Sequence, residues 1–428
     1  MKVKNYNFGD FVEINTSDKV WRGTLLESYD SEIILLKLES GYNIGVREEK
    51  ILSVKILKKK ILEDKKRFQI KKNKELKNIV LIITGGTISS RLDSKTGGVI
   101  STDEEEILNL SPQIKDICNI VKIEKPFMKF SEDMSFLDWK KLTQACEKYL
   151  NDSKIDGIVI THGTDFLHYT SAYLSFSIKN LNKPIALTYS QRSIDRASSD
   201  SSLNLVCACK YATSEIAEIA LVGHENLNDE FCLALPANKV RKMHTSRRDA
   251  FKPINANPIA RISLDHLEIL REFSPKNEKK RVRIDPVFSD KVALIKIIPG
   301  QNPDILNYYL KEGYKGLILE VAGIGQIPGK NAKYNWIPKL KKIIDKGIYV
   351  FAVPQAIYGR LNPNIYSSAR QIKKTGVIYL EDMLSETAFI KLSWILGHKS
   401  WYYDFEKVKE KMLENISNEF NFSTGTDY

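Results

Sequence analysis

The sequence predicts an α/β protein in which a small antiparallel β-barrel precedes a two-lobed α/β domain with mostly parallel sheets. Short β-like runs between turn residues fill the first 57 residues, which is typical of a small barrel. From residue 78 onward, continuous apolar runs alternate with helical segments, and such runs indicate parallel strands covered on both faces. A charged, Pro-containing stretch at 271–290 interrupts this alternation, so we expect it to link two lobes.

The predicted barrel spans residues 1–57, and turn signals such as Gly9-Asp10 and Ser40-Gly41 separate its β-like runs. The runs lie at 11–14, 21–28, 33–38, 42–46 and 51–57. Residues 58–77 follow as a basic, polar stretch with too few apolar residues for a core. We interpret this stretch as a linker.

Two α/β lobes are expected after the linker. The first lobe, 78–270, has predicted strands at 79–83, 157–160, 185–188 and 231–235. The second lobe, 291–428, has predicted strands at 292–298, 317–320, 348–353 and 377–380, and predicted helices at 385–396 and 406–416. The Asn/Ser/Thr-rich end of the chain is expected to fray.

The chain is basic, with 65 Lys and Arg against 53 Asp and Glu in 428 residues, and its formal net charge is +12. The basic runs fall in the predicted connecting segments, at 58–60, 65–67, 71–74 and 279–281. Two interpretations stay open for these runs. They are either solvated surface or a contact with the phosphate backbone of an RNA.

The compartment follows from two further features of the sequence. The start of the chain lacks the apolar region of a secretory signal, and no apolar run has the roughly 20 residues of a membrane span. The five cysteines form no Cys-x-x-Cys pair; they are Cys118, Cys146, Cys207, Cys209 and Cys232. We therefore expect a cytoplasmic chain with reduced thiols and no membrane contact.

Polar residues follow two of the predicted strands of the first lobe, where ligands bind in doubly wound sheets. The first strand ends in Thr84-Gly85-Gly86-Thr87-Ile88, whose glycines allow the backbone to approach a ligand closely. A tight turn without a ligand would have a similar sequence. The second junction is Thr161-His162-Gly163-Thr164-Asp165, in which Asp165 is either a helix N-cap or a functional carboxylate.

A threonine hydroxyl is a poor nucleophile until a base accepts its proton, and a lysine can serve as that base. The dense polar segment at 239–251 offers Lys242 for this role. A third polar cluster at 190–200 follows the predicted strand 185–188, and we interpret it as a loop that orders the adjacent site. No histidines pair at metal-ligand spacing, so we expect no catalytic metal.

These residues together resemble the signature motifs of the type I/II L-asparaginase family. The motifs are Thr84 to Ile88, Ser131-Glu132-Asp133-Met134, His162 to Asp165, and Lys242 nine residues before Phe251. The resemblance covers about 78–396 and implies an asparaginase-like α/β domain. The polar segments at 190–200 and 242–251, together with the amino-terminal barrel, are similar to the D subunits of archaeal glutamyl-tRNA(Gln) amidotransferases.

The resemblance implies glutamine hydrolysis through an acyl-enzyme, with Thr87 as the nucleophile. Thr164, Asp165 and Lys242 would form the second half of the catalytic set, although the order in which the two threonines act stays open. The implied substrate-binding residues are Gly86, Ser131, Glu132, Gly163 and Gln326. Backbone N–H groups near the two threonines are the expected oxyanion donors.

The resemblance also implies partners. The chain would supply ammonia to a tRNA-binding, ATP-using E subunit, which converts Glu-tRNA(Gln) to Gln-tRNA(Gln). We expect no cofactor in this chain, and ATP and Mg in the partner protein. A homodimer of this chain within a heterotetramer is the implied assembly.

Two departures from the family pattern concern the predicted site. Where the family commonly has a tyrosine in a mobile loop, this chain has Ser94, which cannot replace a phenol as a proton relay. The segment from Val321 to Gln326 differs from the Gly-Thr-Gly-Leu-Gly-His run that is usual among the D subunits. The preference for Gln over Asn therefore stays open.

Two rival functions remain: a stand-alone L-asparaginase, or a catalytically weak scaffold that binds RNA through its lysines. The barrel and its basic linker favour the amidotransferase, because a small-molecule hydrolase does not require them. One spatial requirement decides whether the site is catalytic at all. The catalytic hypothesis requires that Thr87, Thr164, Asp165 and Lys242 converge on a common cleft although they lie far apart in the chain.

Overall fold

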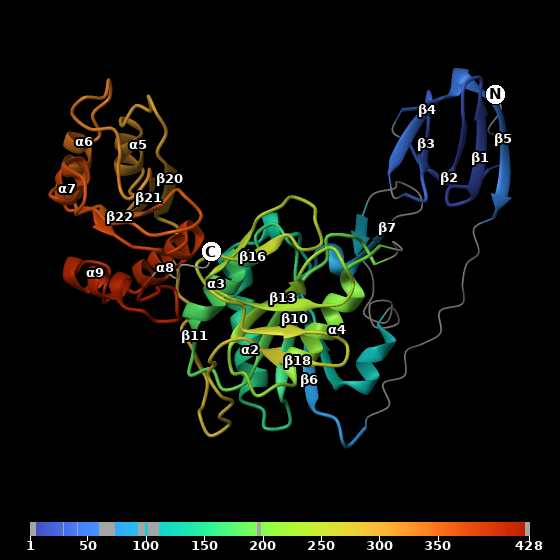
Figure 1. The fold of residues 1–428 in the computed structure, drawn as a ribbon, viewed down its shortest axis with the longest axis horizontal. Helices are drawn as coiled ribbons and strands as arrows, with labels where there is room; N and C mark the ends of the chain where they lie inside the picture. Colours follow the sequence, from blue (N-terminus) through green and yellow to red (C-terminus); the bar gives the residue numbers. More distant parts are fainter. Residues whose placement is uncertain are drawn as a thin grey trace.

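The computed structural model describes residues 6–28, 30–40, 42–59, 73–92, 99–101, 111–194 and 198–423. An amino-terminal β-sheet, a central α/β lobe and a C-terminal α/β lobe follow one another along the chain (Figure 1). The predicted linker 58–77 is described only in part, since residues 60–72 lie outside these ranges.

The amino-terminal part is a five-stranded antiparallel sheet in the order β4-β3-β2-β1-β5. Its strands are β1 (Phe11–Thr16), β2 (Val20–Leu26), β3 (Ile33–Lys37), β4 (Asn43–Arg47) and β5 (Ile51–Lys58), with the 3₁₀ turn η1 (Glu48–Lys50) before β5. Alternate residues such as Val12 and Ile14 are fully buried, as a half-buried strand requires. In the described residues no ladder joins β4 to β5, so the sheet is open at that seam.

The central lobe is built on an eight-stranded sheet in the order β18-β17-β14-β13-β12-β10-β6-β9. The five strands from β13 to β9 are parallel: β6 (Asn78–Ile83), β9 (Asn119–Glu124), β10 (Gly157–Thr161), β12 (Ile185–Thr188) and β13 (Ile219–His224). Three antiparallel strands extend one edge: β14 (Cys232–Pro236), β17 (Ala260–Ile262) and β18 (Leu267–Ile269).

Helices cover both faces of this sheet, as the continuous apolar strands predict. Ile79, Leu81 and Ile83 of β6 pack on the side of α4 (Ser201–Ala212), and Val80 and Ile82 pack on the side of α2 (Phe136–Leu150) and α3 (Leu167–Ser177). Short elements complete the lobe: η2 (Thr87–Ser89), β7 (Ser90–Leu92), β8 (Val99–Ser101), η3 (Pro112–Asp116), η4 (Ser131–Asp133), β11 (Ile178–Lys179), β15 (Val240–Lys242), β16 (Phe251–Pro253) and β19 (Arg283–Ile284).

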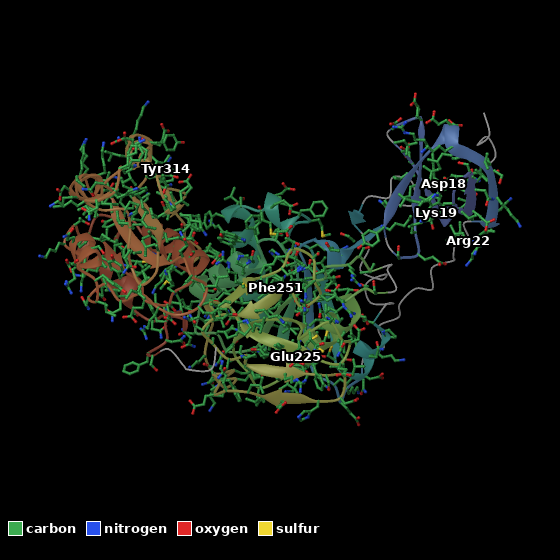
Figure 2. All side chains as sticks on the ribbon, turned by 45° about the horizontal axis from the view of Figure 1, so that its top comes forward. Asp18, Lys19, Arg22, Glu225, Phe251 and Tyr314 are labelled. Carbon is green, nitrogen blue, oxygen red and sulfur yellow. The ribbon has the colours of Figure 1, made fainter. Side chains whose placement is uncertain are left out.

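Side chains fill the interior of the central lobe, where Phe251 of β16 is labelled in Figure 2. Its ring packs on that of Tyr189, with ring centroids 4.6 Å apart, and both side chains are almost fully buried. A large aromatic contact of this kind fixes the segment around Lys242 against the end of β12.

The C-terminal lobe has a parallel four-stranded sheet in the order β20-β21-β22-β23. Its elements are β20 (Val292–Lys296), α5 (Ile305–Lys311), β21 (Gly316–Val321), α6 (Ile337–Asp345), β22 (Tyr349–Pro354), α7 (Ser367–Lys373), β23 (Ile378–Tyr379), α8 (Ser385–Leu396) and α9 (Phe405–Leu413). The predicted fold class is thus confirmed, and the predicted helix at 385–396 coincides with α8.

The two α/β lobes share one apolar core. Helix α8 packs beside α3, as Figure 1 shows, and a single cluster joins Trp139 and Tyr173 of the central lobe to Trp394 of α8. Trp139 and Tyr173 stack with ring centroids 5.3 Å apart. Because apolar side chains of both lobes bury one another here, the lobes are held in a defined relative position.

The prediction that the Asn/Ser/Thr-rich end frays is wrong for residues 417–423. Glu419 forms an ion pair of 2.6 Å with Lys391, and both side chains are completely buried. The hydroxyl of Ser417 donates to the carbonyl of Ser175 in the central lobe at 2.8 Å. Burial and specific hydrogen bonds hold this segment in place despite its polar composition. Residues 424–428 lie outside the described part of the chain.

The thiols and helices agree with the broad class expected from composition. All five cysteines are buried and free. Among the helices of the described residues, none combines the length and the apolar character that crossing a bilayer requires. The basic run 279–281 is exposed on the described surface, whereas 65–67 lies outside it.

Candidate active site

The loop after β6 lies directly against the loop after β10. Gly85 and Gly86 both have positive φ angles, of 112° and 81°. A Cβ on Gly86 would lie 2.4 Å from the Cα and N of Gly163, and one on Gly85 would lie 2.3 Å from the carbonyl oxygen of Lys129. The two glycines are therefore required both by backbone conformation and by space.

A third loop closes the same cluster. A Cβ on Gly163 would lie 3.0 Å from the N of Ser131, and the Ser131 hydroxyl accepts a hydrogen bond from the N–H of Phe166 at 3.3 Å. The structure thus brings together the loops that carry Gly86, Ser131 and Gly163. Since parallel strands end at one edge of a sheet, loops that follow β6 and β10 meet there.

Thr87 stands at the start of η2, immediately after this glycine contact, and is half-buried. The hydroxyl of Thr87 forms no hydrogen bond with any residue in the described part of the chain. The backbone N–H groups of Thr87, Thr164 and Asp165 likewise donate to no described residue. A hydroxyl beside backbone N–H groups that donate to no described residue is an arrangement that acyl transfer can use.

Lys242 joins Thr164 and Asp165. Its amine nitrogen lies 2.8 Å from the hydroxyl oxygen of Thr164 and 2.6 Å from a carboxylate oxygen of Asp165. The lysine side chain is only 11% exposed, whereas that of Asp165 is 59% exposed. A buried amine in contact with both a hydroxyl and a carboxylate can exchange a proton with the hydroxyl while the carboxylate holds it in place.

Asp165 does not cap the following helix, so the N-cap alternative is wrong. Helix α3 begins at Leu167 with Phe166 as its N-cap, and the carboxylate of Asp165 instead pairs with Lys242. The carboxylate is therefore free of a helix-capping role.

His162 holds the loop of Thr164 from within the protein. Because its Nδ1 lies 2.7 Å from the carbonyl of Gly163, that nitrogen carries the proton and donates it. Nε2 accepts from the hydroxyl of Thr170 at 2.9 Å, and Thr170 in turn accepts from the indole of Trp139 at 2.8 Å. Burial lowers the pKa of His162 to about 4, so the ring is neutral at pH 7 and serves as a structural support.

The remaining predicted residues differ in their placement. Glu132 is exposed within η4 beside Ser131. The side-chain oxygen of Gln326 accepts from the N–H of Ile324 at 3.1 Å, so its described hydrogen bonds stay within its own loop of the C-terminal lobe. Ser94 lies outside the described residues.

The polar loop at 190–200 is organised by one buried carboxylate. Asp200 is fully buried and accepts from the hydroxyl of Ser190 and from the N–H groups of Gln191 and Arg192, at 2.9–3.0 Å. Asp200 thus orders this loop from within, and the expected role of the loop in ordering the adjacent site stays a prediction. The residues Asp195 and Arg196 of the same cluster lie outside the described residues.

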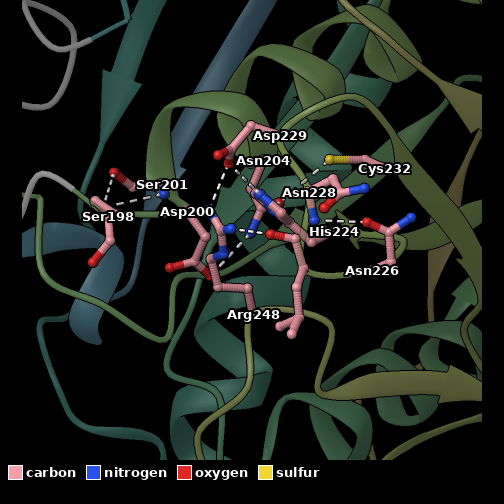
Figure 3. Close-up of polar contacts among 12 residues, drawn as sticks. Ser198, Asp200, Ser201, Asn204, His224, Asn226, Asn228, Asp229, Cys232 and Arg248 are labelled. Carbon is pink, nitrogen blue, oxygen red and sulfur yellow. Dashed lines mark hydrogen bonds and ion pairs between the residues drawn. The ribbon is translucent and has the colours of Figure 1, made fainter.

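Figure 3 shows how this loop is tied to the segment after Lys242. His224 places its two ring nitrogens 2.6 Å from the Oδ1 of Asn204 and 3.0 Å from a carboxylate oxygen of Asp229. The same carboxylate pairs with Arg248 at 2.6 Å. Sequence reasoning missed this network because Asn204, His224 and Asp229 lie in no shared motif, and only Arg248 stands in a polar run.

A pocket of about 400 Å³ adjoins the Lys242 and Asp165 side chains and lies between the two lobes. Burial lowers the pKa of His168 in its wall to about 3, with help from Arg241 and Lys242. Burial raises the pKa of Glu386, although the nearby Arg241 acts in the opposite direction. The lining residues are Asp165, Phe166, His168, Tyr169, Arg241, Lys242, Met243, His244, Thr245 and Glu386.

Metal ligands are not a feature of this site as far as it is described. Within the residues that the structure describes, no three His, Cys, Asp or Glu side chains are grouped so that they could hold a metal ion. The chemistry of the described groups is that of hydroxyls, an amine, a carboxylate and backbone donors.

Three family models match the chain in consecutive segments. The models are described as GatD N-terminal domain, matching residues 6–57, Asparaginase, N-terminal, matching 78–274, and Glutaminase/Asparaginase C-terminal domain, matching 291–412. The first match falls on the five-stranded sheet, and the other two fall on the two α/β lobes.

The chain is also similar over its whole length to curated proteins. It is 40% identical to the D subunit of glutamyl-tRNA(Gln) amidotransferase from Pyrococcus abyssi, over 100% of this chain and 98% of that protein. The D subunit from Thermococcus kodakarensis is 41% identical over 95% of this chain and 92% of its own length. The D subunit from Methanococcus maripaludis strain C6 is 38% identical over 97% of this chain and 99% of its own length.

Among solved structures, two asparaginases are similar to the chain. The thermostable L-asparaginase from Thermococcus kodakarensis matches with a TM-score of 0.72 and 29% identity, and L-asparaginase I from Vibrio cholerae with 0.68 and 26%. Each match covers 81% of this chain and 100% of the other.

Proposed function

The chain belongs to the family of the D subunits of glutamyl-tRNA(Gln) amidotransferase, and on that premise we propose that it hydrolyses glutamine to glutamate and ammonia. The single observation that carries this proposal is the contact of the Lys242 amine with Thr164 and Asp165, at 2.8 and 2.6 Å. No core-packing requirement explains an amine, a hydroxyl and a carboxylate brought together at the carboxyl edge of a parallel sheet.

In the first step, the hydroxyl oxygen of Thr87 bonds to the amide carbon of glutamine. The hydroxyl proton passes to the leaving nitrogen as the carbon–nitrogen bond breaks, so ammonia departs and a glutamyl ester remains on Thr87. Backbone N–H groups of the Gly86 and Gly163 loops stabilise the negative charge that develops on the carbonyl oxygen. In other enzymes one such donor contributes about 3 kcal/mol to the transition state.

In the second step, water attacks the ester carbon, the bond to Thr87 breaks, and glutamate leaves. A proton moves from this water along the contact between the Thr164 hydroxyl and the Lys242 amine and is returned to the oxygen of Thr87 as the ester bond breaks, while Asp165 keeps the lysine in place. Ser131, Glu132, Gly86 and Gly163 hold the amino-acid end of the substrate. This assignment is supported by the packing of the Gly86, Gly163 and Ser131 loops on one another.

The ammonia is used by a partner. We infer a complex with the tRNA-binding E subunit, which uses ATP and Mg to activate Glu-tRNA(Gln), and a homodimer of this chain within a heterotetramer. The family model for the amino-terminal domain at 6–57 supports a role in such an assembly, since that segment contributes none of the groups described at the site.

A stand-alone L-asparaginase is the second candidate, because the two solved asparaginases each match 81% of this chain over their full length. The experiment that separates the two measures ammonia release from glutamine and from asparagine, with and without the partner protein and charged tRNA. We expect glutamine turnover that rises when the partner and tRNA are present. Strong asparagine turnover by the isolated chain would establish the second candidate instead.

A further inference from the structure

The strand that carries Lys242 is too short to fix its own orientation. Strand β15 has three residues, and within the described part of the chain it pairs with the three residues of β16 alone, with Lys242 opposite Phe251. An isolated two-stranded ribbon is marginally stable at best, so neighbouring groups must determine where its side chains point. Several of those neighbours belong to the other lobe.

The two residues before β15 are bound by the C-terminal lobe. The carbonyl of Asn238 accepts from the hydroxyl of Thr387 at 2.9 Å, and its amide donates to the carbonyl of Ser417 at 2.9 Å. The amine of Lys239 pairs with Asp382 at 2.7 Å, and these two side chains are only 1% and 2% exposed. Such a buried pair tolerates little displacement, because separating the two groups leaves each charge buried without its counter-charge.

Arg241, the residue next to Lys242, reaches the first turn of α8. Its Nε lies 3.0 Å from a carboxylate oxygen of Glu386, whose side chain is 7% exposed while that of Arg241 is 31% exposed. Adjacent residues of a strand point to opposite faces. Arg241 therefore binds the C-terminal lobe on one face of β15 while Lys242 binds Thr164 and Asp165 on the other.

Glu386 is well suited to hold this position. It lies in the first turn of α8, where a negative charge is favourable at the helix N-terminus, and the helix itself is packed in the shared core of both lobes. Glu386 also lines the same pocket as Lys242 and Asp165.

We propose that Glu386, acting through Arg241, is a positioning residue for Lys242, so that the C-terminal lobe sets the geometry of amide hydrolysis. The inference rests on the proposed glutaminase function and adds a residue that touches none of the reacting atoms. Displacement of a reacting group by about 1 Å can reduce a rate by about 100-fold, so a shift of β15 is sufficient to slow the reaction.

The test compares Glu386→Ala and Glu386→Gln with the matched control Glu218→Gln in the assembled amidotransferase. Glu218 pairs with Arg271 at 2.6 Å with a similar burial, 13% and 25% exposed, at the opposite end of the central sheet. We expect kcat for glutamine to fall about 10- to 100-fold in Glu386→Ala with KM nearly unchanged. The decrease in kcat should be smaller in Glu386→Gln, and Glu218→Gln should keep the kcat of the parent protein.

Two further readouts separate positioning from general loss of structure. Amidotransferase activity with added ammonia should stay at the parent level in Glu386→Ala. In a double-mutant cycle, Arg241→Gln combined with Glu386→Ala should be no slower than the slower single variant, because both changes remove the same link. The proposal would be overturned if the fold-decreases in kcat of the two single variants multiplied in the double variant. It would also be overturned if kcat were unchanged in Glu386→Ala.

The outcomes also distinguish this inference from the proposed function. If Lys242→Ala and Thr164→Ala abolish glutamine hydrolysis while Glu386→Ala does not, only the positioning role fails. If Lys242→Ala leaves glutamine hydrolysis intact, the proposed function itself fails.

Discussion

The amine of Lys242 lies 2.8 Å from the hydroxyl of Thr164, although 78 positions separate the two residues in the sequence. Nothing local to either residue specifies this contact. Thr164 is placed by the end of β10 and by the buried ring of His162, and Lys242 is placed by the ribbon of β15 and β16. The contact therefore joins two separate parts of the central lobe, and the residues beside Lys242 are also bound by the C-terminal lobe.

Removal of the lysine amine should abolish use of glutamine. Lys242→Ala is expected to lower glutamine-dependent activity by about 10² to 10⁴-fold, because the hydroxyl of Thr164 loses its proton acceptor. Activity with added ammonia should persist, as measured by formation of Gln-tRNA in the assembled enzyme. Lys339→Ala is the matched control, since Lys339 also pairs with an aspartate at 2.6 Å, on the surface of the C-terminal lobe. Equal losses in both variants would contradict a specific role for Lys242.

Gly86→Ala should cost both activity and stability. Gly347 has nearly the same φ angle, 87° against 81°, but no atom lies within 4 Å of the Cβ it would gain. Gly347→Ala thus measures the conformational cost alone, about 1–2 kcal/mol in the free energy of unfolding. The loss in the free energy of unfolding should be larger in Gly86→Ala than in Gly347→Ala, because the added Cβ collides with Gly163. The Gly86→Ala variant should also be unable to hydrolyse glutamine. Denaturant unfolding and an ammonia-release assay check the two parts, and equal costs would show that the contact with Gly163 is unimportant.

The neutral ring of His162 predicts a loss of stability in mild acid. Its pKa in the folded protein, about 4, lies below the ordinary value of 6.5, so the unfolded chain binds a proton that the folded chain does not. This contribution to stability is complete above pH 6.5 and is lost as the pH falls through about 4. A shift of this size corresponds to about 3 kcal/mol in the free energy of unfolding.

The comparison for His162 is His162→Gln, measured by denaturant unfolding at several pH values between about 7 and about 4. The variant should lose less stability over this range than the parent protein. His168, whose pKa is about 3, remains in both proteins, so the difference between them isolates His162. Parallel pH curves for parent and variant would contradict the assignment of a neutral buried ring.

The buried pair of Lys391 and Glu419 predicts a marked difference between single and double substitution. Lys391→Met leaves the buried carboxylate of Glu419 without its counter-charge and should destabilise the protein by about 3–5 kcal/mol. The double variant Lys391→Met, Glu419→Leu should recover most of that loss, because no charge is then left alone. Thermal or denaturant unfolding measures both, and a double variant as unstable as the single one would refute this account.

The sequence was sufficient to predict the strands that end at the site, because each is a continuous apolar run followed by small or polar residues. The runs before Thr84 and Thr161 became β6 and β10, and Lys242 met Thr164 as the catalytic hypothesis requires. The antiparallel extension through β17 and β18 was not predicted, since strands of three residues carry too little periodicity.

The sequence could not reveal contacts that only the packing of the two lobes creates. Asp382, Glu386 and Ser417 stand in ordinary surroundings, yet they bind Lys239, Arg241 and Asn238. The polar composition of residues 417–423 suggested a frayed end, because a buried carboxylate such as Glu419 is indistinguishable from a solvated one until its partner is known.

The residues of the C-terminal lobe that bind the segment before β15 are synthesised late. Asp382 lies 143 positions after Lys239, and Ser417 lies 179 positions after Asn238. At about 5–20 residues per second, translation needs about 7 to 30 seconds to supply the first of these residues. A nascent chain that has already folded its central lobe would therefore lack the contacts that hold β15 in place until the residues of the C-terminal lobe have been made.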